Sequence, residues 1–252
     1  MRSTLSGRLH VGRTHVAGLA ILGGAIAFVV LEQLAETAYP GFDASTQPLS
    51  RLGNSDAPTR LLWDAGLIGL ALSWLLATAA MATWGAGRLL MVLNVAPAVG
   101  LSAAVAVPLD VNLAAHEVAA FGAFVIGIIA MFVNASRLRR PWSLVTLAGA
   151  GLALAALSPA SSLLLDVVGW GTLERMVVLP LIGSLITLGL ALLFDGWSES
   201  PPRGFVRRFV LPVAALLLAL MGVGSGLTAG GTSVVAAELS RHVPPSMPSP
   251  LR

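Results

Sequence analysis

The sequence predicts an all-α integral membrane protein, folded as a bundle of seven transmembrane helices. Two observations lead to this fold class. Hydrophobic residues make up 56% of the 252 residues, charged residues only 11%, and the mean hydropathy is +0.85. Seven apolar stretches are also long enough to cross the hydrocarbon layer, which is about 30 Å thick and takes roughly 20 helical residues. We expect one transmembrane domain over residues 1–240 and a Pro- and Ser-rich, disordered tail at 241–252.

The first predicted helix covers residues 15–34 and reads HVAGLAILGGAIAFVVLEQL. We expect a retained helix rather than a removed signal peptide, because the apolar run is long and no small-residue cleavage site follows it. The same criterion of apolar length predicts six more helices, at residues 61–83, 89–108, 112–134, 143–165, 174–194 and 209–229.

The last predicted helix carries three glycines four residues apart, Gly222, Gly226 and Gly230. This spacing puts them on one face, where two helix backbones can approach closely. Two interpretations stay open. The face packs inside the bundle, or it contacts a second copy of the chain or a partner membrane protein.

The arginines predict the orientation in the membrane. Ten of the 15 lie on the side of the N-terminus, whereas ten of the 12 acidic residues lie on the opposite side. Since basic residues accumulate in cytoplasmic loops, we expect a cytoplasmic N-terminus and an external C-terminus.

Missing residue types exclude several kinds of chemistry. The chain has no cysteine, which excludes disulfides, thiolate catalysis and cysteine-ligated metals, and it has no lysine, which excludes a Schiff base. His116 is the single histidine inside the predicted hydrocarbon zone, too few for a zinc site. We expect no metal and no other cofactor. Nucleic acid is not an expected partner, because the net charge is only +3 and the arginines lie between apolar blocks.

The first outer loop, residues 35–60, is the longest predicted connection. Pro40-Gly41, Pro48 and Gly53-Asn54 favour turns, so the loop is expected to fold back on itself. A loop of this length is either a functional lid or a flexible connector. Its apolar residues favour the lid. They are Tyr39, Leu49 and Leu52.

The stretch VPLDVNLAAHEVAAF, residues 107–121, places polar side chains at the start of a membrane helix. Asp110 is predicted to cap this helix by accepting hydrogen bonds from its free amides. Asn112 and His116 are four residues apart and share a helical face. An ionisable residue at the depth of His116 is costly unless it faces a cavity or a partner.

Polar residues of other segments are predicted at the same outer level, including Glu32 and Glu36 of the first helix. The candidate ligand-binding residues among them are Tyr39, Asp43, Ser50, Arg51, Asp64, Asn112, His116, Glu174 and Arg175. Three interpretations stay open: a structural role that fastens the loop, a pocket for the head group of a membrane lipid or for a small amphiphile, and catalysis.

The catalytic alternative is a lipid-modifying hydrolase or transferase. In it His116 is the general base, Ser50 a nucleophile, and Asp110, Asp43 or Glu174 orients the histidine. A proton-coupled transporter is a third alternative. Asn94, Pro97 and Pro180 could interrupt helices, but the sequence predicts no carboxylate near the middle of the membrane.

Three motifs in order resemble a known family: YPGFDASTQPLSRLGNSDAP, VPLDVNLAAHEVAAFGAF and GTLERMVVLP. Across residues 15–195 they are similar to the prokaryotic multipass membrane family catalogued as domain of unknown function 998. The resemblance implies a six-helix core, to which the seventh helix is an addition, and a prokaryotic plasma membrane, but no established reaction. That family is distantly similar to the Frag1/DRAM/Sfk1 group, which implies a lipid-related role. The matching residues are Tyr39, Pro40, Gly41, Asp43, Ser50, Leu52, Gly53, Pro108, Asp110 and His116.

Overall fold

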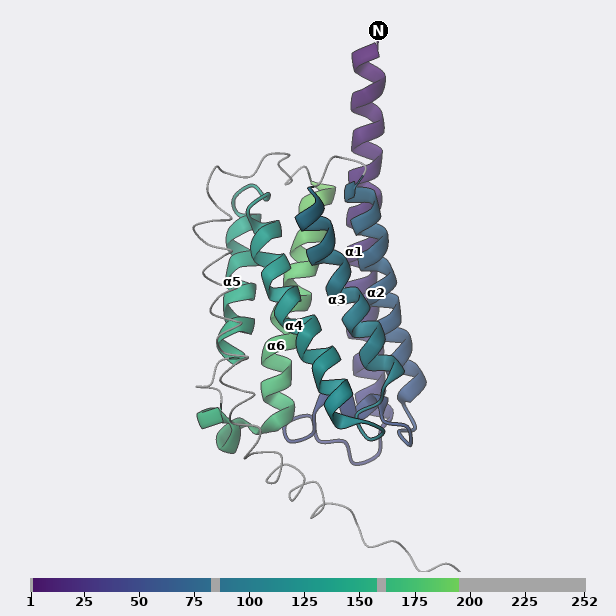
Figure 1. Cartoon of the computed structure of the whole chain (residues 1–252), viewed down its shortest axis with the longest axis vertical. Coiled ribbons are helices and arrows are strands. Elements are labelled where there is room, and N and C mark those ends of the chain that lie inside the picture. The colour runs from purple at the N-terminus through teal and green to yellow at the C-terminus, as the bar shows by residue number, and fades with distance from the viewer. Residues whose placement is uncertain (1, 83–86, 158–161, 195–252) are drawn as a thin grey trace, which may run out of the picture.

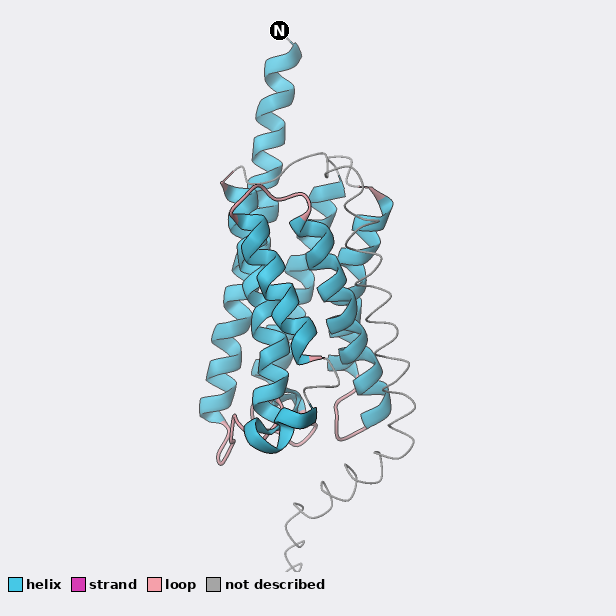
Figure 2. Cartoon of the chain, turned by 90° about the vertical axis from the view of Figure 1, so that its left-hand side faces the viewer, coloured by secondary structure: helices cyan, strands magenta, loops and turns pink. Residues whose placement is uncertain are grey.

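The computed structural model describes residues 2–82, 87–157 and 162–194. These residues form a short 3-10 helix, η1, and six α-helices (Figures 1 and 2). The predicted helix at 209–229, its three glycines and the tail at 241–252 lie outside the described residues. The elements are α1 (Arg2–Ala38), η1 (Leu49–Gly53), α2 (Arg60–Ala82), α3 (Arg88–Ala106), α4 (Leu113–Ala135), α5 (Trp142–Ala156) and α6 (Ser162–Leu193).

The six helices form a closed ring. Each packs against the next along the chain, α6 packs back against α1, and α4 also contacts α6 (Figure 1). In the described part of the chain, five helices are long and apolar enough to cross a membrane by length and composition, and α5 is shorter. The chain is therefore an all-helical, multipass membrane protein.

Close packing of α1 on α6 depends on glycine. A β-carbon at Gly18 would lie 2.8 Å from the carbonyl oxygen of Gly189, which is too close for a real contact. The large apolar side chains on the outer faces, such as Leu19 and Leu72, are more than half exposed and suit a lipid environment. The ring thus uses small residues where α1 meets α6 and presents large apolar side chains on its outer faces.

Four predicted helix boundaries, in three helices, were wrong. The helix α1 extends beyond 15–34 at both ends, α5 ends at Ala156 rather than 165, and α6 begins at Ser162 rather than 174. The apolar composition runs on through 143–165, so apolar length alone did not identify the end of α5 at Ala156. The helix α6 bends at Gly169, which has a φ of 77°, so its first turns are not collinear with the rest.

A buried polar network joins three helices inside the ring. The indole Nε1 of Trp74 on α2 donates to Asn94 Oδ1 on α3 over 3.1 Å. Asn134 Nδ2 on α4 donates to the same oxygen over 3.0 Å. Both asparagines are completely buried, so these bonds satisfy groups that would otherwise destabilise the bundle.

Candidate functional site

Residues 39–59, here called the cap loop, cover the end of the bundle opposite the N-terminus (Figure 1). The loop contains η1, whose Leu49 and Leu52 are completely buried. Burial of two leucines is worth several kcal/mol, at about 1.5–3 kcal/mol for each side chain. The cap loop is therefore a packed part of the fold.

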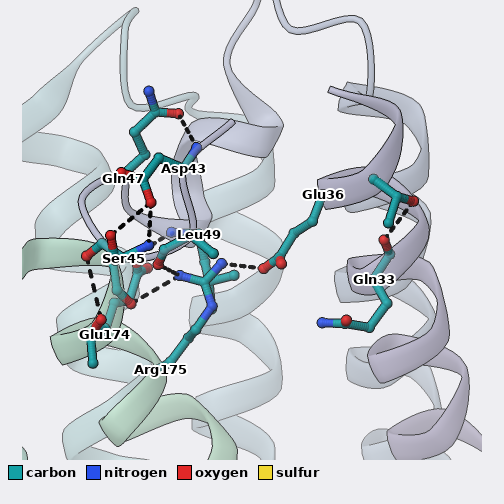
Figure 3. Close-up of polar contacts among 12 residues, drawn as sticks. Gln33, Glu36, Asp43, Ser45, Gln47, Leu49, Glu174 and Arg175 are labelled. Atoms are coloured by element: carbon teal, nitrogen blue, oxygen red, sulfur yellow. Dashed lines mark hydrogen bonds and ion pairs between the residues drawn. The ribbon is translucent and has the colours of Figure 1, made fainter. Parts of the chain in front are cut away.

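The part of α6 that follows its bend binds the cap loop through polar contacts (Figure 3). Thr172 donates its backbone N–H to the carbonyl oxygen of Ser45 over 3.0 Å. Arg175 Nη1 donates to the carbonyl oxygen of Ala44 over 2.6 Å. In the opposite direction, Leu49 donates its backbone N–H to Glu174 Oε2 over 2.6 Å.

Two glycines at the bend of α6 allow the cap loop to come this close. A β-carbon at Gly171 would lie 2.2 Å from the carbonyl oxygen of Gln47, and one at Gly169 would lie 2.4 Å from that of Ser45. Gly169 also has a positive φ, a backbone conformation that residues with a side chain rarely adopt. The bend and the two glycines together form the surface against which the cap loop packs.

Arg175 also ties the cap loop to α1. Its Nη2 forms an ion pair with Glu36 Oε1 (Figure 3), and its guanidinium lies 5.8 Å from the ring centre of Phe42. The ring of Tyr39 stacks on Phe42 with centres 5.7 Å apart. Of the predicted site residues, Tyr39 and Arg175 thus fasten the loop.

Asp110 fastens the other end of the cap loop. It accepts hydrogen bonds from the backbone N–H of Ser55, over 3.0 Å, and from the Ser55 hydroxyl. Burial acts against the charged form, but these hydrogen bonds outweigh it and lower the pKa of Asp110. The predicted capping role of Asp110 was wrong. Asn112 caps α4, accepting from the backbone N–H of Ala115 over 3.1 Å.

His116 is buried one turn inside α4. Its Nδ1 lies 3.1 Å from the carbonyl oxygen of Ala104 and 2.8 Å from that of Val107, at the end of α3. Because carbonyl oxygens only accept, Nδ1 carries a hydrogen in these contacts, and in the neutral ring Nε2 is then the acceptor. Asn112 is exposed as the cap of α4, and its carbonyl oxygen accepts from the backbone N–H of His116 over 3.0 Å.

A cavity of about 60 Å³ lies inside the ring. Its walls come from the cap loop and from every α-helix except α5. Ser50, His116 and Glu174 line it towards the cap loop, and the remaining lining is apolar or aromatic. The other lining residues are Phe28, Trp63, Leu67, Leu70, Trp74, Pro97, Leu101, Ala104, Ala120, Ala123, Phe124, Gly127, Val178, Leu181, Ile182 and Leu185.

Glu32 lies one helical turn from Phe28 on α1 and is only 2% exposed. Its buried Oε2 has no hydrogen-bond partner among the described residues. The carboxyl group interacts electrostatically with Glu36, Glu174 and Arg175. The candidate ligand-binding residues did not include Glu32, although its four-residue spacing from Phe28 and Glu36 is a signal for an inward face.

Three further predicted site residues are not in the cavity lining. Asp43 is exposed and accepts from the backbone N–H and hydroxyl of Ser45 and from the Thr46 hydroxyl, which lower its pKa to about 2. Asp64 pairs with Arg60 Nε over 3.2 Å. The side chain of Arg51 forms no hydrogen bond or ion pair within the part of the chain that the structure describes, and its backbone pairs with Pro48 and Asn54 in η1.

A model of the family described as protein of unknown function (DUF998) matches residues 21–191. The chain belongs to this family. The DUF998 match runs from α1 to the end of α6 and includes the cap loop and every residue that lines the cavity. Comparison with curated proteins finds no match, and neither does comparison with solved structures. In the described residues, no three His, Cys, Asp or Glu side chains come together as metal ligands.

Proposed function

We propose that this DUF998 protein binds a small amphiphile in the cavity beneath the cap loop, in the plasma membrane of a prokaryote. The change in lining along the cavity is the observation that carries the proposal. Ser50, His116 and Glu174 offer polar contacts towards the cap loop, and aromatic and aliphatic side chains follow between the helices. A ligand with a polar head and an apolar tail matches this division.

The volume of the cavity limits how much of such a ligand fits without a change in the cap loop. About 60 Å³ is less than half of the roughly 150 Å³ that accommodates benzene in an engineered protein cavity. At this volume the cavity holds a few waters or one end of a chain. A whole amphiphile requires displacement of the cap loop, which is why the loop is proposed as a lid.

Binding is favoured over catalysis by the partners of His116. In a histidine that acts as a general base, the second ring nitrogen is usually oriented by a carboxylate. Nδ1 of His116 donates instead to the backbone carbonyl oxygens of Ala104 and Val107. In the neutral ring this leaves Nε2 as an acceptor, which we assign to the head group of the ligand.

The test uses a variant that fills the cavity. Ala120 lines it, and Ala120→Val adds about two methyl groups, a volume comparable to the free space. The purified protein in neutral detergent micelles is titrated with 1-octanol while its melting temperature is recorded. We expect octanol to raise the melting temperature of the wild type and to have little effect on Ala120→Val.

The matched control is Ala114→Val, since Ala114 lies on the same helix and is exposed. It should respond to octanol as the wild type does. The proposal fails if octanol leaves the wild type unchanged, or if Ala120→Val responds as strongly as Ala114→Val.

A further inference from the structure

We infer that the ligand of this cavity carries a cationic head group that donates hydrogen bonds, such as a primary ammonium group. The inference rests on the proposed function and names the chemical class of its ligand. Two observations support it: the surplus of carboxyl groups around the polar side of the cavity, and a buried acceptor among them that has no donor.

The excess of carboxyl groups is local, and Arg175 alone does not balance their charge. Glu32, Glu36 and Glu174 interact electrostatically around this one arginine. The arginine is fully engaged, because Nη2 pairs with Glu36 and Nη1 donates to the carbonyl oxygens of Ala44 and Gly171. Within the described residues, Glu32 and Glu174 therefore form no ion pair and share the field of Arg175 with Glu36.

The unpartnered acceptor is Oε2 of Glu32, which is buried and receives no hydrogen bond from any described residue. A buried carboxyl oxygen without a donor is costly, and proteins rarely leave one unsatisfied. Glu174, which interacts electrostatically with Glu32, lines the cavity. Glu32 does not itself line the cavity, so a cationic donor bound at this side would contact Glu174 and be attracted by the charge of Glu32 behind the lining.

The same arrangement discriminates against other head groups. A phosphate or carboxylate head would be repelled by Glu32 and Glu174, with little screening in a buried site. A hydroxyl head can donate one hydrogen bond but brings no charge. An ammonium head brings both the charge and three donors.

The experiment compares three probes with the same chain: octylammonium, 1-octanol and octanoate. Each is titrated into the purified protein in neutral micelles, and the binding constant is read from tryptophan fluorescence, since Trp63 and Trp74 line the cavity. We expect octylammonium to bind the wild type about tenfold more tightly than octanol, and octanoate to bind most weakly. This comparison needs no variant.

The variant Glu32→Gln removes the charge while keeping the size of the side chain. We expect it to lose most of the preference for octylammonium, to about threefold or less, while its affinity for octanol is unchanged. The matched control is Glu117→Gln, because Glu117 is an exposed glutamate of α4. It should keep the tenfold preference expected of the wild type, within about a factor of two.

The outcomes separate the two proposals. Equal binding of octanol and octylammonium, or an unchanged preference in Glu32→Gln, overturns the cationic head group and leaves amphiphile binding standing. Failure of all three probes to bind overturns the proposed function itself. Short-chain phosphatidylethanolamine and phosphatidylcholine, added as further probes, distinguish a phospholipid amine from a free alkylamine, since choline has no N–H to donate.

Discussion

His116 links two helices through a single ring nitrogen. Its Nδ1 donates to the carbonyl oxygens of Ala104 and Val107, which belong to the end of α3 and have no further helical turn to bond to them. The histidine thus satisfies backbone groups that would be costly at the edge of the hydrocarbon layer. Its other nitrogen remains available, so one residue combines a structural bond with a possible ligand contact.

Asp43 gives a prediction for acid conditions. Hydrogen bonds from Ser45 and Thr46 lower its pKa from the ordinary 3.8 to about 2. A carboxyl group with a lowered pKa stabilises the fold fully above its ordinary pKa, and the contribution is lost as the pH falls towards the lowered value. We expect the wild type to melt at a higher temperature than Asp43→Asn above pH 4 (about the ordinary pKa).

The difference between the two melting temperatures should close as the pH falls from about 4 to about 2. Melting curves of both proteins, recorded in the same micelles across this range, provide the measurement. A difference that widens with acidity, or that persists unchanged at the lower limit, contradicts the assigned hydrogen bonds.

The sequence could predict the depth of the site residues but not their partners. Ser50, His116 and Glu174 were placed at one level by topology alone, and they line one cavity. Asp110 was assigned to a helix cap because it precedes α4, yet it binds Ser55 of the cap loop. Partners far apart in the chain depend on how the loop folds, which no local pattern specifies.

The bend of α6 is the element that seats the cap loop. Because a β-carbon at Gly171 would lie 2.2 Å from the carbonyl oxygen of Gln47, Gly171→Ala should push the loop away from the helix. We expect a loss of about 1–3 kcal/mol in stability, typical of overpacking. Trypsin should then cleave faster after Arg51, which lies between the buried Leu49 and Leu52.

The control for this prediction is Gly183→Ala on the same helix. A β-carbon there meets nothing within 4 Å, so the substitution should be neutral or stabilising by up to about 1 kcal/mol. Equal rates of trypsin cleavage in the two variants would mean that the position of the cap loop does not depend on its close packing against Gly171.

Helix existence was easier to predict than helix ends. Long apolar runs of roughly 20 residues identify helices reliably, since lipid leaves the backbone few alternatives. The bend at Gly169 was missed because glycine in an apolar stretch is common and its φ depends on the loop that packs against it. The short α5 was overestimated for a related reason, since composition alone does not separate the end of one helix from the start of the next.

At the scale of the whole molecule, the orientation predicted from the arginines can be tested directly. The chain has no cysteine, so a single introduced cysteine reports one position. Asp56→Cys marks the cap loop, and Arg139→Cys marks the turn between α4 and α5; both positions are exposed. In intact cells, a membrane-impermeant maleimide should label Asp56→Cys, and should label Arg139→Cys only after permeabilisation. The reverse pattern would invert the predicted topology.

The closure of the ring by α1 and α6 has a consequence for synthesis. The helix α1 leaves the ribosome first, whereas its partner α6 is made more than a hundred residues later. Until then, the face of α1 that bears Gly18 and Glu32 has no α6 to cover it. A nascent chain therefore carries a carboxyl group facing lipid or water-filled translocation machinery, which is unfavourable in hydrocarbon. The last described helix to insert also supplies the final wall of the cavity, so the proposed binding site exists only once the ring has closed.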